Sequence, residues 1–269
     1  MTKRSFLKFL GTLLGLSVAK SLSAKTFNTQ NSGSMPMLKL RKAEERGPSD
    51  FGWLQSMHTF SFGHYYDPEH MGFGTLRVIN EDKVKPGKGF GTHPHKDMEI
   101  ISYVLEGALE HKDSMGNGSI IRPGDVQRMS AGTGVTHSEF NPSEKEDVHF
   151  LQIWFLPNQI GLKPGYEQRN FSTEEKKGKF KLVASEEGRN GSISLNQDMD
   201  MSVAILDNGQ QQSYNLKQDR KAWIHLAKGK VTVNSIQMKA GDGLAIENIE
   251  KLNFQDAKEA EIIVFDMKS

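Results

Sequence analysis

The stretch ISYVLEGALEH (Ile101–His111) consists of an apolar run, a short polar step that ends in glycine, and a second strand-like run. Branched and aromatic residues favour extended strands, and a glycine between two such runs is typical of a hairpin. The same order returns in AWIHLAKGKVTV (Ala222–Val233), and RPGDVQRM (Arg122–Met129) has a counterpart in KAGDGLAI (Lys239–Ile246). This ordered repeat predicts two copies of one β-domain.

Most of the remaining chain also reads as short strands separated by Gly, Pro, Asn and Asp. The clearest runs are TLRVIN (Thr75–Asn80), EIISYVLEG (Glu99–Gly107), GSIIRPGD (Gly118–Asp125), DVQRMSAG (Asp125–Gly132) and VHFLQIWFL (Val148–Leu156). Short strands with frequent turns and no regular helices predict an all-β fold of sandwich or barrel type. STEEKKGKF (Ser172–Phe180) is the best short helix or linker, because Ser172 and Glu175 fit a capping box. We therefore expect one domain over residues 49–171 and a second over residues 180–269.

The first 24 residues have the layout of a secretory signal: Lys3, Arg4 and Lys8, an apolar run, then small residues. The order resembles a twin-arginine signal with Lys3 in place of the first arginine. This predicts a signal peptide over residues 1–24, a linker over 25–48 and a periplasmic protein. The alternative is an uncleaved amphipathic helix on a cytoplasmic protein. The apolar run is too short for a stable membrane span.

The composition excludes several classes of binding and catalytic site. The chain of 269 residues has a net charge of +1, so no basic field points to nucleic acid. It contains no cysteine, which excludes disulfides, thiolate nucleophiles and cysteine-held metals. Any metal must be bound by His, Asp, Glu or backbone oxygen.

Two histidine-containing segments suggest such a metal. In GTHPHKDME (Gly91–Glu99), His93 and His95 project to one face of a strand, because side chains alternate. His137 and Glu139 share a face in the same way. Three imidazoles and a carboxylate suit Fe, Mn, Co, Ni, Cu or Zn, and affinity order does not choose among them. The alternative is a polar strand that contains histidine by chance.

The repeat provides an internal control for the metal interpretation. Aligning Gly229 with Gly107 places Asn215 and Lys217 opposite His93 and His95. Aligning Gly241 with Gly124 places Phe254 and Asp256 opposite His137 and Glu139. The second copy lacks the imidazoles, so the fold does not require them, and this favours a chemical role in the first copy.

The other histidines and the tryptophans give weaker signals. The stretch from Ser56 to Gly74 could line a pocket with His58, His64 and His70, or pack beneath a barrel. The remaining histidines lie in strand-like runs and are expected to be structural, and the tryptophans are expected in the core. These residues are His111, His149, His225, Trp53, Trp154 and Trp223.

These motifs resemble the cupin family. Gly87, His93, His95, Glu99 and Gly107 fit its first motif, and Gly134, His137 and Asn141 fit its second, with Gly132 where proline is usual. HTFSFGHYYDPEHMGFGTLRVINED, GFGTHPHKDMEIISYVLEG and MSAGTGVTHSEFNPS resemble pirin, and especially bacterial pirin-like quercetin 2,3-dioxygenases. The resemblance covers residues 38–269 and implies a bicupin, two tandem β-barrel or jelly-roll cupin domains, with one metal in the first. Its ligands would be His93, His95, His137 and Glu139. Glu99, a ligand in many other cupins, would instead lie beside the ligands and orient a histidine.

The resemblance also implies a reaction. A metal, with iron favoured, would bind a flavonol or related enol for cleavage by O2, and Glu139 would act as general base. The expected binding partners are a small aromatic substrate and O2, and not nucleic acid. We expect the protein to be a monomer. The alternative is a non-enzymatic, redox-sensing metal protein like pirin, and a third possibility is a metal retained for stability alone. A signal segment departs from the family pattern and puts its intracellular location in doubt.

Overall fold

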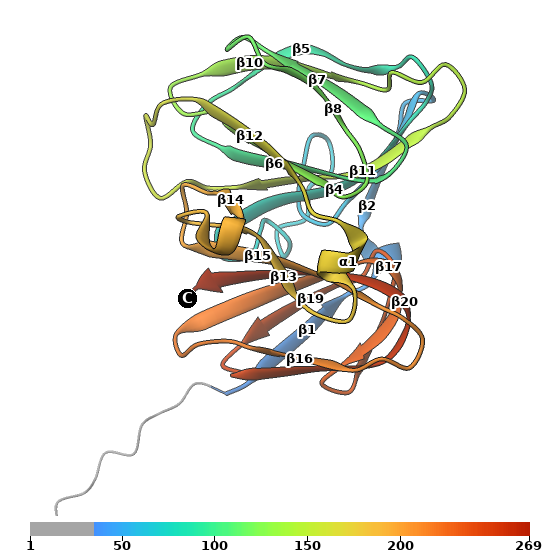
Figure 1. Cartoon of the computed structure of the whole chain (residues 1–269), viewed down its shortest axis with the longest axis vertical. Helices are drawn as coiled ribbons and strands as arrows, with labels where there is room; N and C mark the ends of the chain where they lie inside the picture. Colours follow the sequence, from blue (N-terminus) through green and yellow to red (C-terminus); the bar gives the residue numbers. More distant parts are fainter. Residues whose placement is uncertain (1–34) are drawn as a thin grey trace, which may run out of the picture. The chain divides into compact units, whose positions relative to one another are not determined.

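A computed structural model describes residues 35–269 of the chain (Figure 1). The predicted signal peptide, and the predicted linker as far as residue 34, lie outside the described residues. Over residues 35–269, no helix has the length and apolar character that a membrane crossing requires.

The first half forms two facing antiparallel sheets. Its strands are β2 (Gly47–Asp50), β3 (Leu54–His58), β4 (Leu76–Val84), β5 (Gly89–His95), β6 (Glu99–Glu106), β7 (Leu109–Asp113), β8 (Gly118–Ile121), β9 (Asp125–Ser130), β10 (Val135–Phe140), β11 (Val148–Phe155) and β12 (Gly165–Asn170). One sheet has the order β12-β9-β6-β11-β4-β3-β2, and the other has the order β5-β10-β7-β8. This is a cupin barrel, and its two sheets enclose the space into which alternate side chains project.

The second half forms one nine-stranded sheet that contains two long, continuous strands, β17 and β20. It contains β1 (Met37–Arg41), β13 (Lys181–Ser185), β14 (Ile193–Ser194), β15 (Met199–Leu206), β16 (Gln212–Asn215), β17 (Arg220–Val233), β18 (Ile236–Lys239), β19 (Gly243–Glu247) and β20 (Lys251–Lys268). The sheet order is β1-β19-β17-β20-β15-β13-β14, with β16 on β20 and β18 on β17. The expected all-β bicupin is confirmed.

Glycine geometry supports the internal repeat. Gly107 and Gly229 have φ of 77° and 75°, and Gly124 and Gly241 have φ of 96° and 86°. A Cβ would lie 2.7 Å from the Asp147 carbonyl oxygen at Gly107, and against a backbone carbonyl oxygen at Gly229 as well. Only glycine adopts this backbone without strain, so the turns that we aligned from sequence are structurally equivalent.

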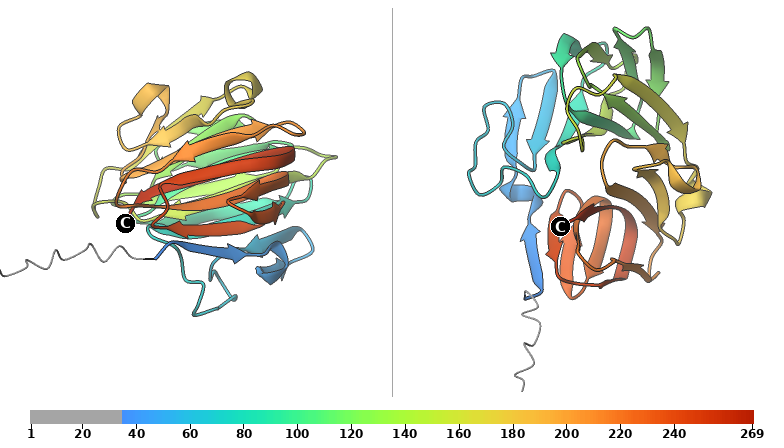
Figure 2. Two further views of the ribbon diagram at one scale, coloured as in Figure 1. Left: turned by 90° about the horizontal axis from the view of Figure 1, so that it is seen from below. Right: turned by 90° about the vertical axis from the view of Figure 1, so that its left-hand side faces the viewer.

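Two expectations about the connecting segments have different outcomes. Residues 37–48 are not a linker: they form β1, the short 3-10 helix η1 (Ala43–Glu45) and the start of β2. β1 pairs with β19, so an N-terminal segment completes the second sheet (Figure 2). The capping box is confirmed, because Ser172 caps α1 (Thr173–Lys176) and Glu175 accepts from the Ser172 backbone. A second 3-10 turn, η2 (Arg189–Gly191), precedes β14.

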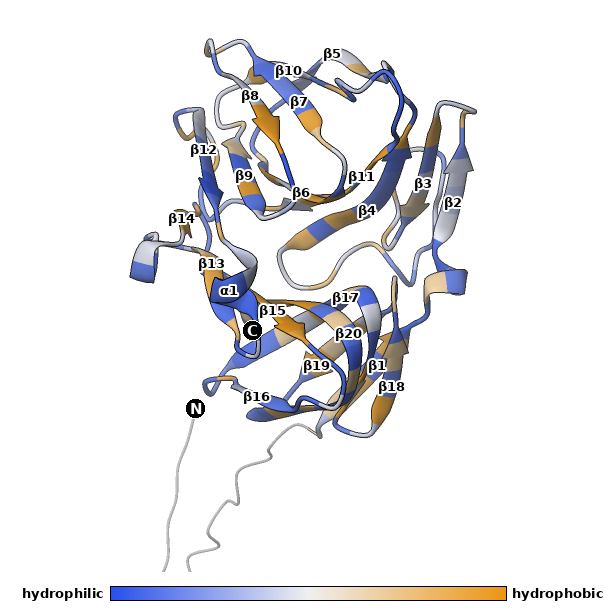
Figure 3. Ribbon diagram, turned by 45° about the vertical axis from the view of Figure 1, so that its right-hand side comes forward, coloured by the Kyte–Doolittle hydropathy of each residue, from blue (hydrophilic) through white to orange (hydrophobic). Residues whose placement is uncertain are grey.

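One apolar core spans both halves. It includes Tyr103 and Phe155 from the first half and Trp223 and Phe265 from the second. Apolar segments recur along the strands of both halves (Figure 3). Tyr103 also donates a hydrogen bond of 2.5 Å to Glu261. The half that contains the predicted metal ligands therefore packs against the second half through a shared core.

His225 lies fully buried on β17, and this predicts acid sensitivity. Burial first, and the nearby Arg46 charge second, lower the pKa of His225 to about 4. The unfolded chain takes up this proton near pH 6.5, so stability falls between pH 6.5 and 4, by about 3 kcal/mol at most. We expect His225→Leu to flatten the dependence of unfolding free energy on pH, measured by urea titration. His64→Leu, at an exposed histidine, is the control, and equal slopes in wild type and His225→Leu would contradict the assignment.

Candidate metal centre

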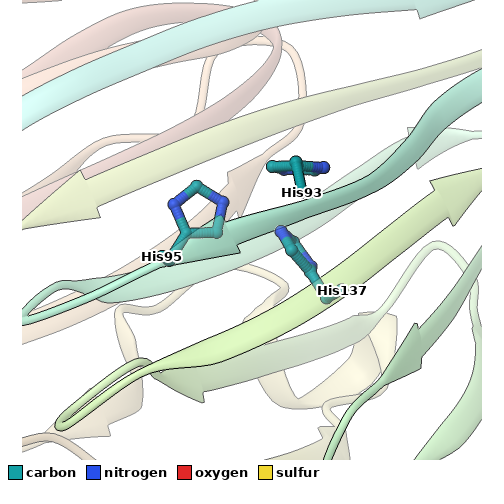
Figure 4. A group of neighbouring side chains, drawn as sticks. All are labelled: His93, His95 and His137. Atoms are coloured by element: carbon teal, nitrogen blue, oxygen red, sulfur yellow. The ribbon is translucent and has the colours of Figure 1, made fainter.

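Three imidazoles come together where β5 and β10 pair. The register places His93 opposite His137, and His95 follows two residues along the same face of β5. Ring nitrogens of the three side chains all lie within 4.8 Å of one another (Figure 4). The strand parity predicted from the sequence, together with this register, explains why the rings share one site.

The ring nitrogens are available for a metal. His93 Nδ1 lies 2.8 Å from the Gly91 carbonyl oxygen, which can only accept, so Nδ1 carries the proton and Nε2 keeps its lone pair. His95 Nε2 and both His137 nitrogens are buried without a hydrogen-bond partner among the described residues. Burial, followed by the neighbouring imidazoles, lowers the pKa of His95 to about 4 and that of His137 to about 3. Neutral, unpartnered imidazoles fit a divalent transition metal.

Glu139 lies buried on β10 beside this group. Gln152 Nε2 lies 3.0 and 2.8 Å from its two carboxylate oxygens, and Ser102 Oγ lies 3.2 Å from one of them. The Glu139 carboxylate lies within 4.8 Å of donor atoms of His137 and His111. His137 thus belongs to two overlapping donor groups, one with His93 and His95, and one with His111 and Glu139.

His111 was not expected at the site. We predicted a satisfied structural histidine, yet its Nδ1 is buried with no hydrogen-bond partner in residues 35–269, and its Nε2 lies 3.3 Å from Asp113. β7 pairs with β10 so that His111 stands opposite Glu139. The pairing of non-adjacent strands, which the sequence does not reveal, makes it a neighbour of the site.

Within residues 35–269, the Glu99 carboxylate makes no hydrogen bond to any of the three predicted metal-binding histidines. It accepts hydrogen bonds from the Asn196 backbone nitrogen at 3.3 Å and from the Asn196 side chain at 3.1 Å. The expectation from sequence is wrong, because Glu99 connects the barrel to the segment before β15. The Gly91 carbonyl orients His93 instead.

Strand register identifies the residues of the second half that correspond to the site. Glu139 pairs with His111 on β7, and Phe254 pairs with Val233, which lies four residues after Gly229 as His111 lies four after Gly107. Phe254 therefore corresponds to Glu139. Leu252 corresponds to His137, and its partner Tyr214 corresponds to His93.

The alignment from sequence was therefore displaced. It placed Phe254 opposite His137, but two residues fewer separate Gly241 from Phe254 than separate Gly124 from Glu139. It also placed Asn215 opposite His93, but the β5–β10 pairing contains a bulge, which the regular β16–β20 pairing lacks. The conclusion drawn from the alignment is unchanged: the second half lacks imidazoles at the equivalent positions. Apolar and aromatic side chains of the second-barrel core occupy the equivalent interior: Tyr214, Val233, Leu252 and Phe254.

This filled interior gives a prediction. Phe254 is 1% exposed, so Phe254→Ala should lower the free energy of unfolding by about 3–5 kcal/mol through cavity formation. Metal content per folded protein should not change. Denaturant unfolding and elemental analysis measure the two quantities. The control is Phe140→Ala, at a residue next to Glu139 that is 37% exposed. It should lower the free energy of unfolding by under about 1 kcal/mol. Loss of metal in Phe254→Ala would contradict the core assignment.

A cavity of ≈ 360 Å³ opens onto His93, His95 and Glu139. Its apolar lining includes Phe51, Leu54, Phe62, Phe90 and Trp154. The Trp154 ring lies 4.8 Å from the His95 ring in edge contact, so this tryptophan lines the site while it also packs against a core cluster of the first half, as expected. Among the three histidines expected to line a pocket or pack, His58 and His64 line this cavity, while His70 binds Asp67 and lines another.

The first half matches the family model described as pirin over residues 39–155, and the second matches the quercetinase C-terminal cupin domain over residues 182–267. Quercetin 2,3-dioxygenase of Escherichia coli K12 is 48% identical, covering 86% of this chain and 99% of its own. The pirin-like protein of Caulobacter vibrioides is 37% identical, with coverages of 86% and 99%.

Solved structures agree with the sequence comparison. The crystal structure of YhhW from Escherichia coli superposes with a TM-score of 0.83 at 47% identity, covering 86% of this chain and 97% of that one. Bacterial pirin YhhW in complex with nickel(II) gives a TM-score of 0.82 at 46% identity, covering 86% and 99%. A relative with the same fold thus binds a divalent metal.

Proposed function

Because the chain belongs to the pirin family, we propose that it is a metal-dependent dioxygenase that cleaves a flavonol or related enol with O2. The observation that carries the proposal is the cluster of three imidazoles at the edge of a cavity with aromatic sides. A relative named quercetin 2,3-dioxygenase, 48% identical to this chain, supports the reaction type.

His93, His95 and His137 would hold the metal, with Glu139 as the fourth ligand. The donors suit several divalent ions, and a relative has been crystallised in complex with nickel(II). We propose iron as the native metal, with Mn, Co, Ni, Cu and Zn as alternatives. When bound, such a metal supplies a Lewis acid for the enolate oxygen and a position for O2.

The protein's own groups would handle the proton and orient the substrate. Glu139 takes the proton of the substrate hydroxyl at a carboxylate oxygen, and Gln152 holds that carboxylate in place with its amide nitrogen. Phe90 and Trp154 line the cavity beside the histidines and would pack against a flat ring. The apolar side chains also exclude water from the enolate.

The reaction balances with O2 as the oxidant. Two carbon–carbon bonds of the heterocyclic ring break, and the carbon that carried the hydroxyl leaves as carbon monoxide. Both oxygen atoms of O2 enter the ring-opened ester acid. No further reductant is required.

The test is O2-dependent loss of quercetin absorbance by metal-replete protein. We expect turnover with iron or another metal of the series, and a fall of at least about 100-fold after chelation, since the metal supplies the Lewis acid. Restoring the metal should restore the rate. A protein with one metal per chain and no O2 uptake across a panel of flavonols and related enols would exclude a flavonol dioxygenase.

A further inference from the structure

The cavity beside the metal centre has a second polar surface, built on the opposite sheet. Five polar side chains line it, which we call the polar wall: Ser49, Ser56, His58, Asn80 and Asp82. They come from β2, β3 and β4 of the seven-stranded sheet, whereas His93 and His95 belong to the four-stranded sheet. The cavity therefore has the metal donors on one sheet and the polar wall on the other.

Strand register explains how the polar wall forms. Ser49 pairs with Ser56, and Ser56 pairs with Asp82. In the next row, His58 pairs with Asn80, which pairs with Gln152 on β11. The second row continues to the side chain that holds the Glu139 carboxylate, so the polar wall and the metal centre share one interior surface.

Hydrogen bonds fix the orientation of His58 within the polar wall. His58 Nδ1 lies 2.8 Å from Asn80 Oδ1, and His58 Nε2 lies 2.9 Å from Ser49 Oγ. Because the amide oxygen only accepts, Nδ1 carries the proton and Nε2 accepts from the serine hydroxyl. The Ser49 oxygen then keeps lone pairs that can accept from a ligand.

Asp82 provides a second reason to expect a ligand. Its Oδ1 is buried and has no hydrogen-bond partner among the described residues. Burial, as the largest cause, raises the pKa of Asp82 to about 7. An unpaired buried carboxyl oxygen is costly, and a ligand hydroxyl in this cavity would satisfy it.

The cavity between these surfaces suits a flat ligand. Phe62 and Trp154 lie in edge contact with ring centroids 5.4 Å apart, and Phe62 lies 5.4 Å from the His58 ring. A volume of ≈ 360 Å³ is within the range of small-molecule sites. A ligand that matches both surfaces is an aromatic molecule with one hydroxyl at the metal centre and further hydroxyls at its other end.

We infer that the polar wall binds the outer-ring hydroxyls of a polyhydroxylated aromatic substrate and makes the site selective for it. This inference rests on the proposed function and deepens it. His58 and Ser49 act as positioning residues, and neither one contacts the reacting carbon. Quercetin carries outer-ring hydroxyls, whereas 3-hydroxyflavone keeps only the hydroxyl that the metal centre requires, so the pair isolates the effect of the polar wall.

The test compares both compounds on wild type, Ser49→Ala and His58→Phe. We expect wild type to favour quercetin over 3-hydroxyflavone in kcat/KM by roughly 10-fold or more, as for one or two hydrogen bonds. Both variants should reduce this ratio at least about 5-fold, chiefly through KM. His70→Phe is the matched control. His70, like His58, bonds a polar side chain through its ring, but it does not line this cavity, so the variant should keep the wild-type ratio.

Binding provides a readout that does not depend on turnover. Quenching of tryptophan fluorescence gives Kd for each compound, and Trp154 lies in the cavity wall. A wild-type preference for quercetin that Ser49→Ala weakens supports the polar wall, even if no flavonol is turned over and the proposed reaction fails. Equal Kd values for the two compounds in wild type, or equal weakening of both in Ser49→Ala, would overturn it. Ser49→Ala removes a single hydroxyl, so it keeps the test valid if His58→Phe does not fold.

Discussion

Replacing His137 with alanine should abolish both metal binding and turnover. His137 is 2% exposed and belongs to both donor groups, so its loss leaves neither group complete. We expect metal affinity to fall roughly 100-fold or more and the dioxygenase rate to fall at least about 1,000-fold, because the Lewis acid is lost. Elemental analysis of the purified protein and O2 uptake with quercetin measure the two effects.

His149→Ala is the matched control for this variant. His149 is a part-buried histidine of the same barrel that bonds Glu81 through Nε2 at 2.9 Å, and it is outside both donor groups. We expect it to keep wild-type metal content and rate. Circular dichroism confirms that each variant is folded. His137→Ala protein that is folded, metal-replete and active would show that the metal lies elsewhere.

Replacing Glu139 with glutamine should separate chemistry from folding. The amide keeps the size of the side chain but loses the charge and the basic oxygen that would take the substrate proton. Loss of a general base lowers rates by roughly 100- to 10,000-fold, so we expect a fall in kcat within this range. Stopped-flow absorbance under saturating O2 measures kcat directly, and metal content reports any ligand effect separately.

Glu99→Gln is the isosteric comparison. Glu99 is 1% exposed and accepts a hydrogen bond from Asn196. This variant should lower the melting temperature and leave kcat within about 3-fold of wild type, because it loses a structural hydrogen bond rather than a reacting group. The opposite result, with Glu99→Gln inactive and Glu139→Gln unaffected, would assign the carboxylate role to Glu99.

Much of the fold could be predicted because its signals are local. The apolar runs around Gly107 and Gly229 predicted strand, turn and strand, and both glycines adopt the left-handed backbone that the turns require. The placement of β1 could not be predicted, because residues 37–41 have no local feature that indicates pairing with β19. Long-range pairing depends on which edge is left uncovered, and that depends on the whole fold.

The candidate site could also be predicted only in part. His93 and His95 could be paired from sequence, because alternation places residues i and i+2 on one face. The grouping of His137 and Glu139 with this pair was inferred from residue types and strand alternation, and the resemblance agreed with it. The nearness of His111, and the row of paired polar residues His58, Asn80 and Gln152, could not be inferred. These neighbours come from adjacent strands, and their register becomes visible only when the sheets are formed.

The most direct test of the central claim is the mass of the product formed from quercetin under ¹⁸O2 by protein with one metal per chain. The account predicts a ring-opened product that contains both labelled oxygen atoms, with one carbon monoxide released for each O2 consumed. An unlabelled product, or consumption of quercetin without O2 uptake, would contradict a dioxygenase centred on His93, His95, His137 and Glu139.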